Sequence, residues 1–148
     1  KCSSNANVRL GVFMALVGGP VGGANANPSG TGTGLNYIGN HAYANSGEVA
    51  VTNSETILLE FTTQNNYVVA TVQFNMLVDT ADDMFYRVKM NGETVNGYLT
   101  QGAQQSTDSN NALPILLPPF SKITMTAVNV GSSTGRNNTC AVVGRVYA

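Results

Sequence analysis

The chain of 148 residues contains one histidine, His41, and any Ser-His-Asp or Cys-His reaction centre would have to use it as the base. His41 lies in the Gly- and Asn-rich stretch NYIGNHAYANSG, which holds no nucleophile motif such as G-x-S-x-G. A zinc site needs several His or Cys ligands, and one histidine with two distant cysteines does not supply them. We therefore interpret His41 as a surface or packing residue, and we expect no catalytic residue, no cofactor and no enzymatic activity.

The one acidic cluster is the segment DTADD, with carboxylates at Asp79, Asp82 and Asp83. Hard cations such as calcium prefer oxygen ligands from loops of this kind, which makes these three residues a weak calcium candidate. Their spacing does not match the EF-hand pattern, and no bidentate Glu follows. The alternative is a solvated turn whose charges keep a strand end from pairing with other chains.

Cys2 and Cys140 are the two cysteines of the chain. A disulfide between them would join the N-terminal segment to the last strand, and closing so long a loop would stabilise the fold by about 4–5 kcal/mol in the loop-entropy model. The alternative is that both are reduced thiols and that Cys140 is a small core residue. The sequence leaves both possibilities open.

Two further features concern sugars. Asn137-Asn138-Thr139 is a glycosylation sequon, which matters only in a eukaryotic secretory pathway. Tyr37, Tyr43, Phe85 and Tyr98 are candidate stacking faces for a bound carbohydrate. The chain has no Trp and no clustered aromatic row, so we rank carbohydrate binding below a structural role.

Charged residues make up 10% of the chain, against a typical ~25%, and the net charge is −1. Solubility must therefore come from neutral polar side chains, chiefly Asn, Thr, Ser and Gly. The seven basic residues are scattered from Lys1 to Arg145. Because phosphate binding needs clustered Lys or Arg, we expect no direct contact with nucleic acid.

The elements that position these residues are strands. In residues 67–78, YVVATVQFNMLV, every second side chain is apolar, which predicts a long central strand with one face on a core. Seven other segments after residue 45 have strand character: 48–52, 56–62, 84–90, 93–100, 112–117, 122–130 and 139–147. A further strand is expected to begin at Tyr37-Ile38. The side chains expected to point inward are Val49, Val51, Ile57, Leu59, Phe61, Val68, Ala70, Val72, Phe74, Met76, Val78, Met84, Tyr86, Val88, Met90, Ile123, Met125, Ala127, Cys140, Val142 and Val146.

Turn signals separate these segments. Asn91-Gly92 predicts a two-residue hairpin turn, because both residues accept a positive φ, and Pro118-Pro119 ends the strand over 112–117. Short strands at regular spacing with no helical pattern predict an all-β, antiparallel β-sandwich. Eight strands favour a jelly roll. An immunoglobulin-like sandwich is the runner-up, weakened by the missing Trp and by the positions of the cysteines.

The N-terminal segment is different in character. Residues 8–17, VRLGVFMALV, are apolar but too few to span a bilayer, and residues 18–34 are dominated by Gly, Pro, Asn, Ala and Thr. We interpret residues 1–34 as an extended arm with a Gly-rich linker, and residues 35–148 as the sandwich domain. The apolar run is either an edge strand or an arm that reaches a neighbouring subunit.

The segments LNYIGNHAYANSG, ETILLEFTTQNNYVVATVQFN, LLPPFSKITMTAVN and VVGRVYA resemble small β-rich proteins encoded by marine bacteriophages and related viruses. The resemblance covers residues 35–148 and consists of strands, a Pro-Pro-Phe turn and the closing Gly-Arg-Val-Tyr. It implies a virion structural protein, such as a capsid decoration, minor capsid or head-fibre subunit at the capsid surface. It assigns no functional residue.

The residues themselves agree with this expectation. A low-charge sandwich with a Gly-rich arm suits a repeated assembly unit, because such an arm can add a strand to a neighbour's sheet edge. We expect a homo-oligomer, a trimer or higher, that also contacts other capsid proteins. The alternatives are a secreted carbohydrate-binding β-sandwich module and a subunit of an extracellular surface filament.

Overall fold

The computed structural model describes residues 33–77, 82–100 and 112–147 of the chain. These ranges are all-β and contain no helix, and therefore no apolar helix of the length needed to cross a membrane. The strands are β1 (Thr33–Ile38), β2 (His41–Asn45), β3 (Val49–Val51), β4 (Thr56–Thr62), β5 (Tyr67–Met76), β6 (Met84–Met90), β7 (Glu93–Thr100), β8 (Leu113–Leu117), β9 (Lys122–Asn129) and β10 (Arg136–Tyr147).

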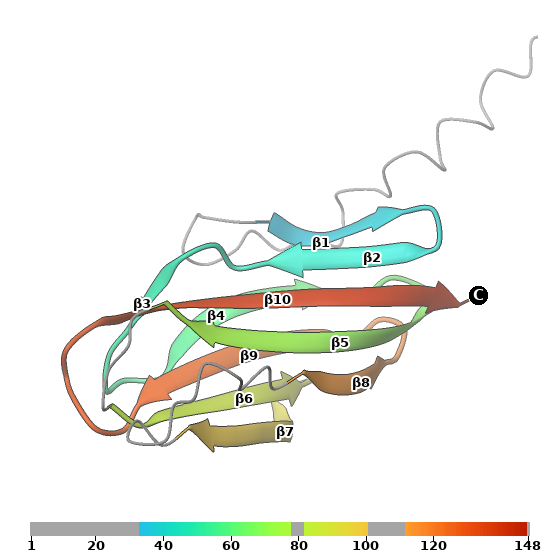
Figure 1. The fold of residues 1–148 in the computed structure, drawn as a ribbon. Coiled ribbons are helices and arrows are strands. Elements are labelled where there is room, and N and C mark those ends of the chain that lie inside the picture. The colour runs from blue at the N-terminus through green and yellow to red at the C-terminus, as the bar shows by residue number, and fades with distance from the viewer. Residues whose placement is uncertain (1–32, 78–81, 101–111, 148) are drawn as a thin grey trace, which may run out of the picture.

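The strands form two antiparallel sheets that lie one over the other (Figure 1). Sheet A has the order β1-β2-β10-β5-β8, and β3 pairs with the first residues of β10 where β2 does not reach. Sheet B has the order β4-β9-β6-β7. The predicted long strand, β5, is an inner strand of sheet A between β10 and β8, and it ends at Met76, two residues earlier than expected.

The pairing of the strands is nested. β6 pairs with β7, β5 with β8, β4 with β9, and β2 and β3 with β10. From β3 to β6, and again from β7 to β10, consecutive strands lie in alternate sheets. The chain therefore follows the path of one long antiparallel hairpin that is wrapped around the core, with the β6–β7 turn at its tip.

The tip of this hairpin is the turn that the sequence predicts. Asn91 has a φ of 52° and Gly92 a φ of 92°, and Met90 pairs with Glu93 across the turn. Both central residues of a type I′ turn need a positive φ, and Asn and Gly tolerate it best. The Asn91 side chain also accepts a hydrogen bond from the backbone N–H of Lys122 at 2.9 Å, which ties the turn to β9.

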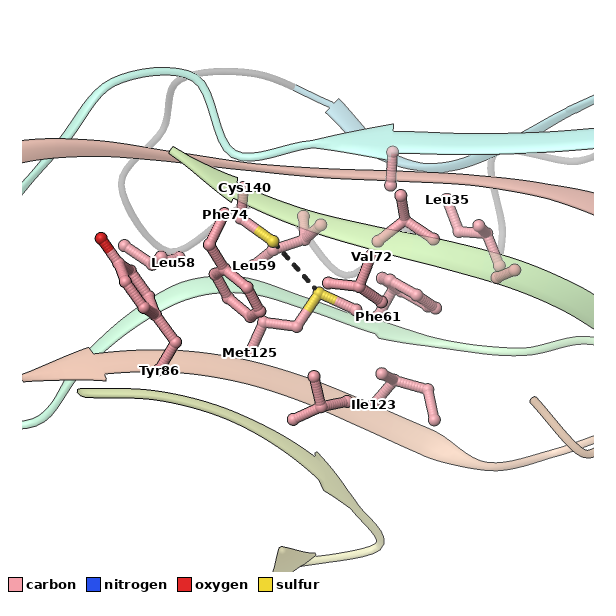
Figure 2. Packing of buried hydrophobic residues seen from close by; sticks show 14 of the residues in the cluster. Leu35, Leu58, Leu59, Phe61, Val72, Phe74, Tyr86, Ile123, Met125 and Cys140 are labelled. Atoms are coloured by element: carbon pink, nitrogen blue, oxygen red, sulfur yellow. Dashed lines mark hydrogen bonds between the residues drawn. The ribbon is translucent and has the colours of Figure 1, made fainter. Parts of the chain in front are cut away.

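The core lies between the inner faces of the two sheets, and the predicted inward faces are confirmed along most strands (Figure 2). Phe74 is 3% exposed, and its ring centroid lies 4.9 Å from that of Tyr86 in the opposite sheet. The Cys140 thiol donates to the Met125 sulfur at 3.4 Å across the same interior. Met76, Met90 and Val146 are only partly buried against this core, and Val78 lies outside the described residues.

Of the inward residues predicted for β4, Leu59 and Phe61 are confirmed and Ile57 is wrong. Ile57 is exposed, whereas Leu58 and Leu59 are both fully buried. The register of β4 against β9 shifts between Ile57 and Leu59, as it does at a β-bulge. An extra residue at this point reverses the alternation, so two neighbouring leucines enter the core and Ile57 turns outward.

Other differences from the sequence-based expectation concern strand boundaries and one additional strand. β10 begins at Arg136 rather than at residue 139, because residues 136–138 pair with β3. The Gly- and Asn-rich stretch around His41 contributes β2, a strand not expected there. The strand expected to begin at Tyr37-Ile38 is β1, which instead begins at Thr33 and ends at Ile38. The last two residues assigned to the linker therefore belong to the sheet, and the remainder of the arm, residues 1–32, lies outside the described residues.

Candidate interaction surface

His41 opens β2 on the outer side of sheet A, where it is exposed and lies opposite Arg145 of β10 in the strand register. The described residues contain no group of three or more His, Cys, Asp or Glu side chains that could hold a metal ion. The position of His41 agrees with its interpretation as a surface residue.

Asp82 belongs to a polar network at one end of the sandwich. Its carboxylate accepts hydrogen bonds from Arg136 Nε at 2.6 Å and from Asn129 Nδ2 at 3.1 Å. Asn129 Oδ1 in turn accepts from the backbone N–H groups of the loop between β9 and β10, which the network thereby holds in place. Asp79 lies outside the described residues, so the calcium hypothesis for Asp79, Asp82 and Asp83 stays a prediction.

Cys140 is a buried free thiol, and burial raises its pKa well above the usual range. Its backbone N–H donates to Ser46 Oγ at 2.7 Å, and its sulfur faces Met125. This environment fits a small core residue. Cys2 lies outside the described residues, so the disulfide between Cys2 and Cys140 also stays a prediction.

The sequon and the four candidate stacking rings do not form a common site. Asn137 lies within β10, and its side-chain amide donates to the Glu48 carboxylate. Tyr37 is buried, and Tyr98 packs on Phe74 and Tyr86 inside the sandwich. The remaining two rings lie on opposite outer surfaces, Tyr43 on sheet A and Phe85 on sheet B.

The surface that stands out is the outer side of sheet A. Its strands bring together seven large apolar side chains with exposed fractions between 37% and 62%. We call this surface face A and define it by Ile38, Tyr43, Tyr67, Val69, Leu116, Val143 and Tyr147.

The strand register shows that these side chains are neighbours. Val143 at the middle of the sheet lies opposite Tyr43 of β2, and Val69 of β5 lies opposite Leu116 of β8. At the end of the two central strands, Tyr147 is the register partner of Tyr67. Cross-strand partners on one face of an antiparallel sheet are within contact distance, so face A is continuous across the sheet.

Among the described residues of β1, β2, β5, β8 and β10, the outer side of sheet A carries one full charge, and the Glu48 carboxylate lies beside Asn137 at the start of β10. Arg145 lies on β10, the middle strand, between His41 and Val69 in the register. Among the described residues, Arg145 forms no ion pair, and none of the outward residues of β1, β2, β5, β8 and β10 beside it is acidic. A continuous apolar surface of this kind is unusual on a sheet whose outer side contacts only solvent.

The outer side of sheet B, which we call face B, is charged and internally paired. Lys89 Nζ and Arg87 NH1 lie 2.8 Å and 2.9 Å from Glu55 Oε1, and Lys122 Nζ lies 3.1 Å from Glu60 Oε1. These five side chains define face B.

One exposed apolar residue outside face A has a strained backbone conformation. Phe120, in the turn between β8 and β9, has a φ of 55° and is 75% exposed. A bulky residue at positive φ is rare and carries a cost in backbone energy. The turn is held by a hydrogen bond from the Phe120 N–H to the Gln64 carbonyl at 2.9 Å.

Sequence reasoning did not find face A, although part of the signal was present. The outward positions of the segments over 67–78 and 139–147 include Tyr67, Val69, Val143 and Tyr147, which an outer strand face in water does not require. The remaining members come from three other strands, and only the sheet order places them beside these four.

Comparison of the chain with family models, with curated proteins and with solved structures found no match.

Proposed function

We propose that the chain is a non-enzymatic structural subunit that assembles with copies of itself through face A, and that it serves in a virion as a capsid decoration, minor capsid or head-fibre subunit. The observation that carries the proposal is the size of face A. Its seven side chains offer on the order of 700 Å² to a partner, close to the ~800 Å² that each partner buries in a standard interface.

The strand order supports a jelly-roll form for this subunit. The nested pairs from β6–β7 out to β3–β10 account for eight strands in two sheets, which is the jelly-roll count. Jelly rolls occur in viral capsid and lectin domains, and the resemblance of residues 35–148 to virion proteins favours the first of these. Fold alone does not determine function, so the assembly surface is the stronger argument.

The N-terminal residues form the second part of the proposal. Residues 8–17 are apolar enough to favour burial, and a flexible linker as long as residues 18–32 has a reach of roughly 20 Å. We assign these residues to a contact with a neighbouring copy. Removal of residues 1–32 should leave a folded domain that assembles poorly, as measured by light scattering. A truncated chain that still forms the full-size oligomer would place the assembly contacts on the sandwich alone.

The test of face A is a charge at its centre. Val143→Glu should lower the molar mass measured by sedimentation, because a carboxylate would be buried in an apolar contact. Val128→Glu is the matched control, since Val128 lies on the outer side of sheet B opposite Phe85. It should leave the mass unchanged. A parent chain that is monomeric at all accessible concentrations, or an oligomer that tolerates Val143→Glu, would overturn the proposal.

Placement in a virion needs a separate observation. Portal or capsid genes next to the coding gene would support it. A neighbourhood of polysaccharide-degrading genes, together with a signal on a glycan array, would favour the carbohydrate-binding alternative.

A further inference from the structure

In the described part of the chain, β1 and β8 are the edge strands of sheet A, and β4 and β7 are those of sheet B. Pro, charged side chains and irregular pairing usually protect such edges from association. β8 contains Pro114, the regular part of β4 contains the charged Glu60, and β1 pairs regularly only over residues 36–38. β7 is the longest of the four, and its residues 96–100 pair regularly with β6 and include neither Pro nor a charged side chain. Figure 1 shows β7 as the outermost strand of sheet B.

The contacts between β6 and β7 show which backbone groups of β7 point away from the sheet. The Thr100 hydroxyl donates to the Met84 carbonyl and accepts from the Met84 N–H, both at 3.3 Å, so the backbone groups of Met84 point toward β7. Met84 and Thr100 are register partners, and backbone direction alternates along an antiparallel ladder. The N–H and C=O groups of Gly97 and Leu99 therefore point away from β6. In agreement, the Gly97 N–H donates to the Asn96 side chain at 2.8 Å.

A bulge sets the limit of this regular edge. The partners of Val88 and Lys89 on β7 are not consecutive, because the register skips Val95. An extra residue of this kind bends the strand and interrupts its line of hydrogen-bonding groups. The regular segment is residues 96–100, which we call the β7 edge.

The β7 edge is complementary to a second copy of itself. A two-fold axis normal to the sheet places two identical strands antiparallel, with the outer side of one sheet continuing the outer side of the other. With the axis at Tyr98, Gly97 of each copy lies opposite Leu99 of the other, so their outward N–H and C=O groups all gain hydrogen-bond partners. With the axis at Gly97, Leu99 would instead lie opposite the bulge at Val95. The axis at Tyr98 therefore satisfies more of the free backbone groups.

The side chains fit the same register. Leu99 is 51% exposed and lies beside Phe85 on the outer side of sheet B. Gly97 has no side chain, because a Cβ there would lie 2.5 Å from the Tyr86 carbonyl oxygen. Leu99 of one copy can therefore cover the bare backbone at Gly97 of the other. Glu93, the one charged residue of β7, begins the strand, so an antiparallel pair keeps the two carboxylates at opposite ends.

We infer that the β7 edges of two copies pair as antiparallel strands about a two-fold axis at Tyr98, which joins the two copies of sheet B into one continuous sheet. The contact is made by backbone hydrogen bonds along a strand edge, and it is independent of face A on the outer side of the other sheet. Together with the proposed contact through face A, it gives each subunit two different neighbours. Two such contacts let an assembly grow beyond a dimer.

The first test places a charge on the β7 edge of a chain whose face A is blocked by Val143→Glu. On this background Leu99→Lys should weaken the remaining association by about tenfold or more, because the two introduced ammonium groups lie diagonally across the axis. Val130→Lys is the matched control, since Val130 is 61% exposed in the loop after β9, outside both surfaces. It should leave the association constant from sedimentation unchanged. Circular dichroism and thermal melts of each variant show whether the fold is intact.

The second test uses a mixture to identify the partner surface. Leu99→Glu on the same background should weaken association as much as Leu99→Lys does. An equimolar mixture of the two variants should recover most of the loss, because each mixed dimer then holds opposite charges across the axis. If the β7 edge met a different surface of the second copy, mixing would give no recovery, and the inference would be wrong.

The third test distinguishes strand pairing from a contact of side chains alone. The backbone N–H of Tyr98 points toward β6, whereas that of Leu99 is free in the single subunit. Amide hydrogen exchange of the Val143→Glu chain should therefore slow at Leu99 as the protein concentration is raised, and change much less at Tyr98. An exchange rate at Leu99 that does not depend on concentration would contradict the pairing.

The outcomes separate this inference from the proposed function. A parent chain that is monomeric at all accessible concentrations contradicts both. An oligomer that Val143→Glu fails to dissociate, but that Leu99→Lys weakens, overturns the role of face A and supports the β7 contact. An oligomer that Val143→Glu reduces to monomers supports face A and overturns the β7 contact.

Discussion

The two outer surfaces of the sandwich differ although they cover the same core. On face B, Glu55 accepts contacts from Lys89 and Arg87, and Glu60 pairs with Lys122. The Thr126 and Thr124 hydroxyls donate to these same two carboxylates at 2.9 Å and 3.1 Å. Every charged side chain of face B therefore has an ion-pair partner within the chain.

Face A has the opposite character. It is made of aliphatic and tyrosine side chains, and its cation Arg145 has no ion-pair partner among the described residues. The inner sides of both sheets contribute to one buried apolar cluster, so the contrast concerns the outward positions. The charged side chains of face B are paired within the chain, whereas the apolar side chains of face A are exposed and Arg145 has no ion-pair partner among the described residues; in the proposed assembly a second copy covers them.

The largest effect should come from the inner side of sheet A. Phe74→Ala removes a buried ring from between the sheets, and such a change costs about 3–5 kcal/mol in the free energy of unfolding. Val143→Ala, on the outer side of the same sheet, should cost less than about 0.5 kcal/mol in the monomer, as surface substitutions do. Chemical denaturation at a concentration too low for assembly measures both values.

Either value can contradict the contrast. A loss below about 1 kcal/mol for Phe74→Ala would show that the inward face of β5 has been wrongly assigned. A loss above about 1 kcal/mol for Val143→Ala would show that face A stabilises the single subunit and is not reserved for a partner.

The next effect concerns the tip of the β6–β7 hairpin. Gly92→Val should destabilise the fold by about 1–3 kcal/mol, because a β-branched residue resists a positive φ. No atom lies within 4 Å of the position that a Cβ would occupy at Gly92, so this cost is one of backbone conformation rather than of crowding. Gly92→Asn is the control and should cost less, because Asn tolerates the left-handed region. Equal losses for Val and Asn, measured by thermal unfolding, would contradict this explanation.

Much of this fold follows from local signals in the sequence. The alternation over residues 67–78 correctly predicts the buried side of β5, and Asn91-Gly92 predicts its turn because the required backbone angles exclude most other residues. The exception at Ile57 has a physical cause. A bulge is a property of how β4 meets β9, and neither strand alone encodes the extra residue.

Face A could not be predicted in the same way. Leu116 and Tyr43 are separated by most of the domain in the sequence, and each is an unremarkable outward residue of a short strand. Their proximity depends on β10 and β5 lying between β2 and β8, which is a result of the nested pairing rather than of any local pattern. The pairing of Asp82 with Arg136 is of the same kind, since it joins the segment before β6 to the first residue of β10, which the strand order brings together.

A smaller effect should be seen at Phe120. Phe120→Gly removes the strain of a positive φ, worth about 1–2 kcal/mol, but it also gives the unfolded chain more freedom, worth roughly 0.5–1 kcal/mol. The ring is 75% exposed and loses little burial. We therefore expect a stability equal to that of the parent or up to about 1 kcal/mol higher, measured by chemical denaturation. A loss of stability would contradict this explanation. It would show that packing of the Phe120 ring on the subunit stabilises the fold by more than the positive φ costs.

The smallest effect should come from the ion pairs of face B. The pKa of Glu55 is lowered to about 2, chiefly by the hydrogen bond from Lys89 and further by those from Thr126 and Arg87. A carboxylate whose pKa is lower in the folded than in the unfolded chain stabilises the fold above its unfolded pKa of about 4.3, and that stability is lost as the pH falls toward 2. Glu55→Gln should therefore flatten the decline in the free energy of unfolding between about pH 5 and pH 2. The side chain is 37% exposed, so solvent screening limits the effect to within about 1 kcal/mol.

Lys89→Gln should flatten the same decline, because it removes the largest contributor to the lowered pKa of Glu55 while keeping the carboxylate. If both variants lose free energy of unfolding with falling pH just as the parent does, the ion pairs of Glu55 do not stabilise the fold, and this part of the contrast between face A and face B is wrong.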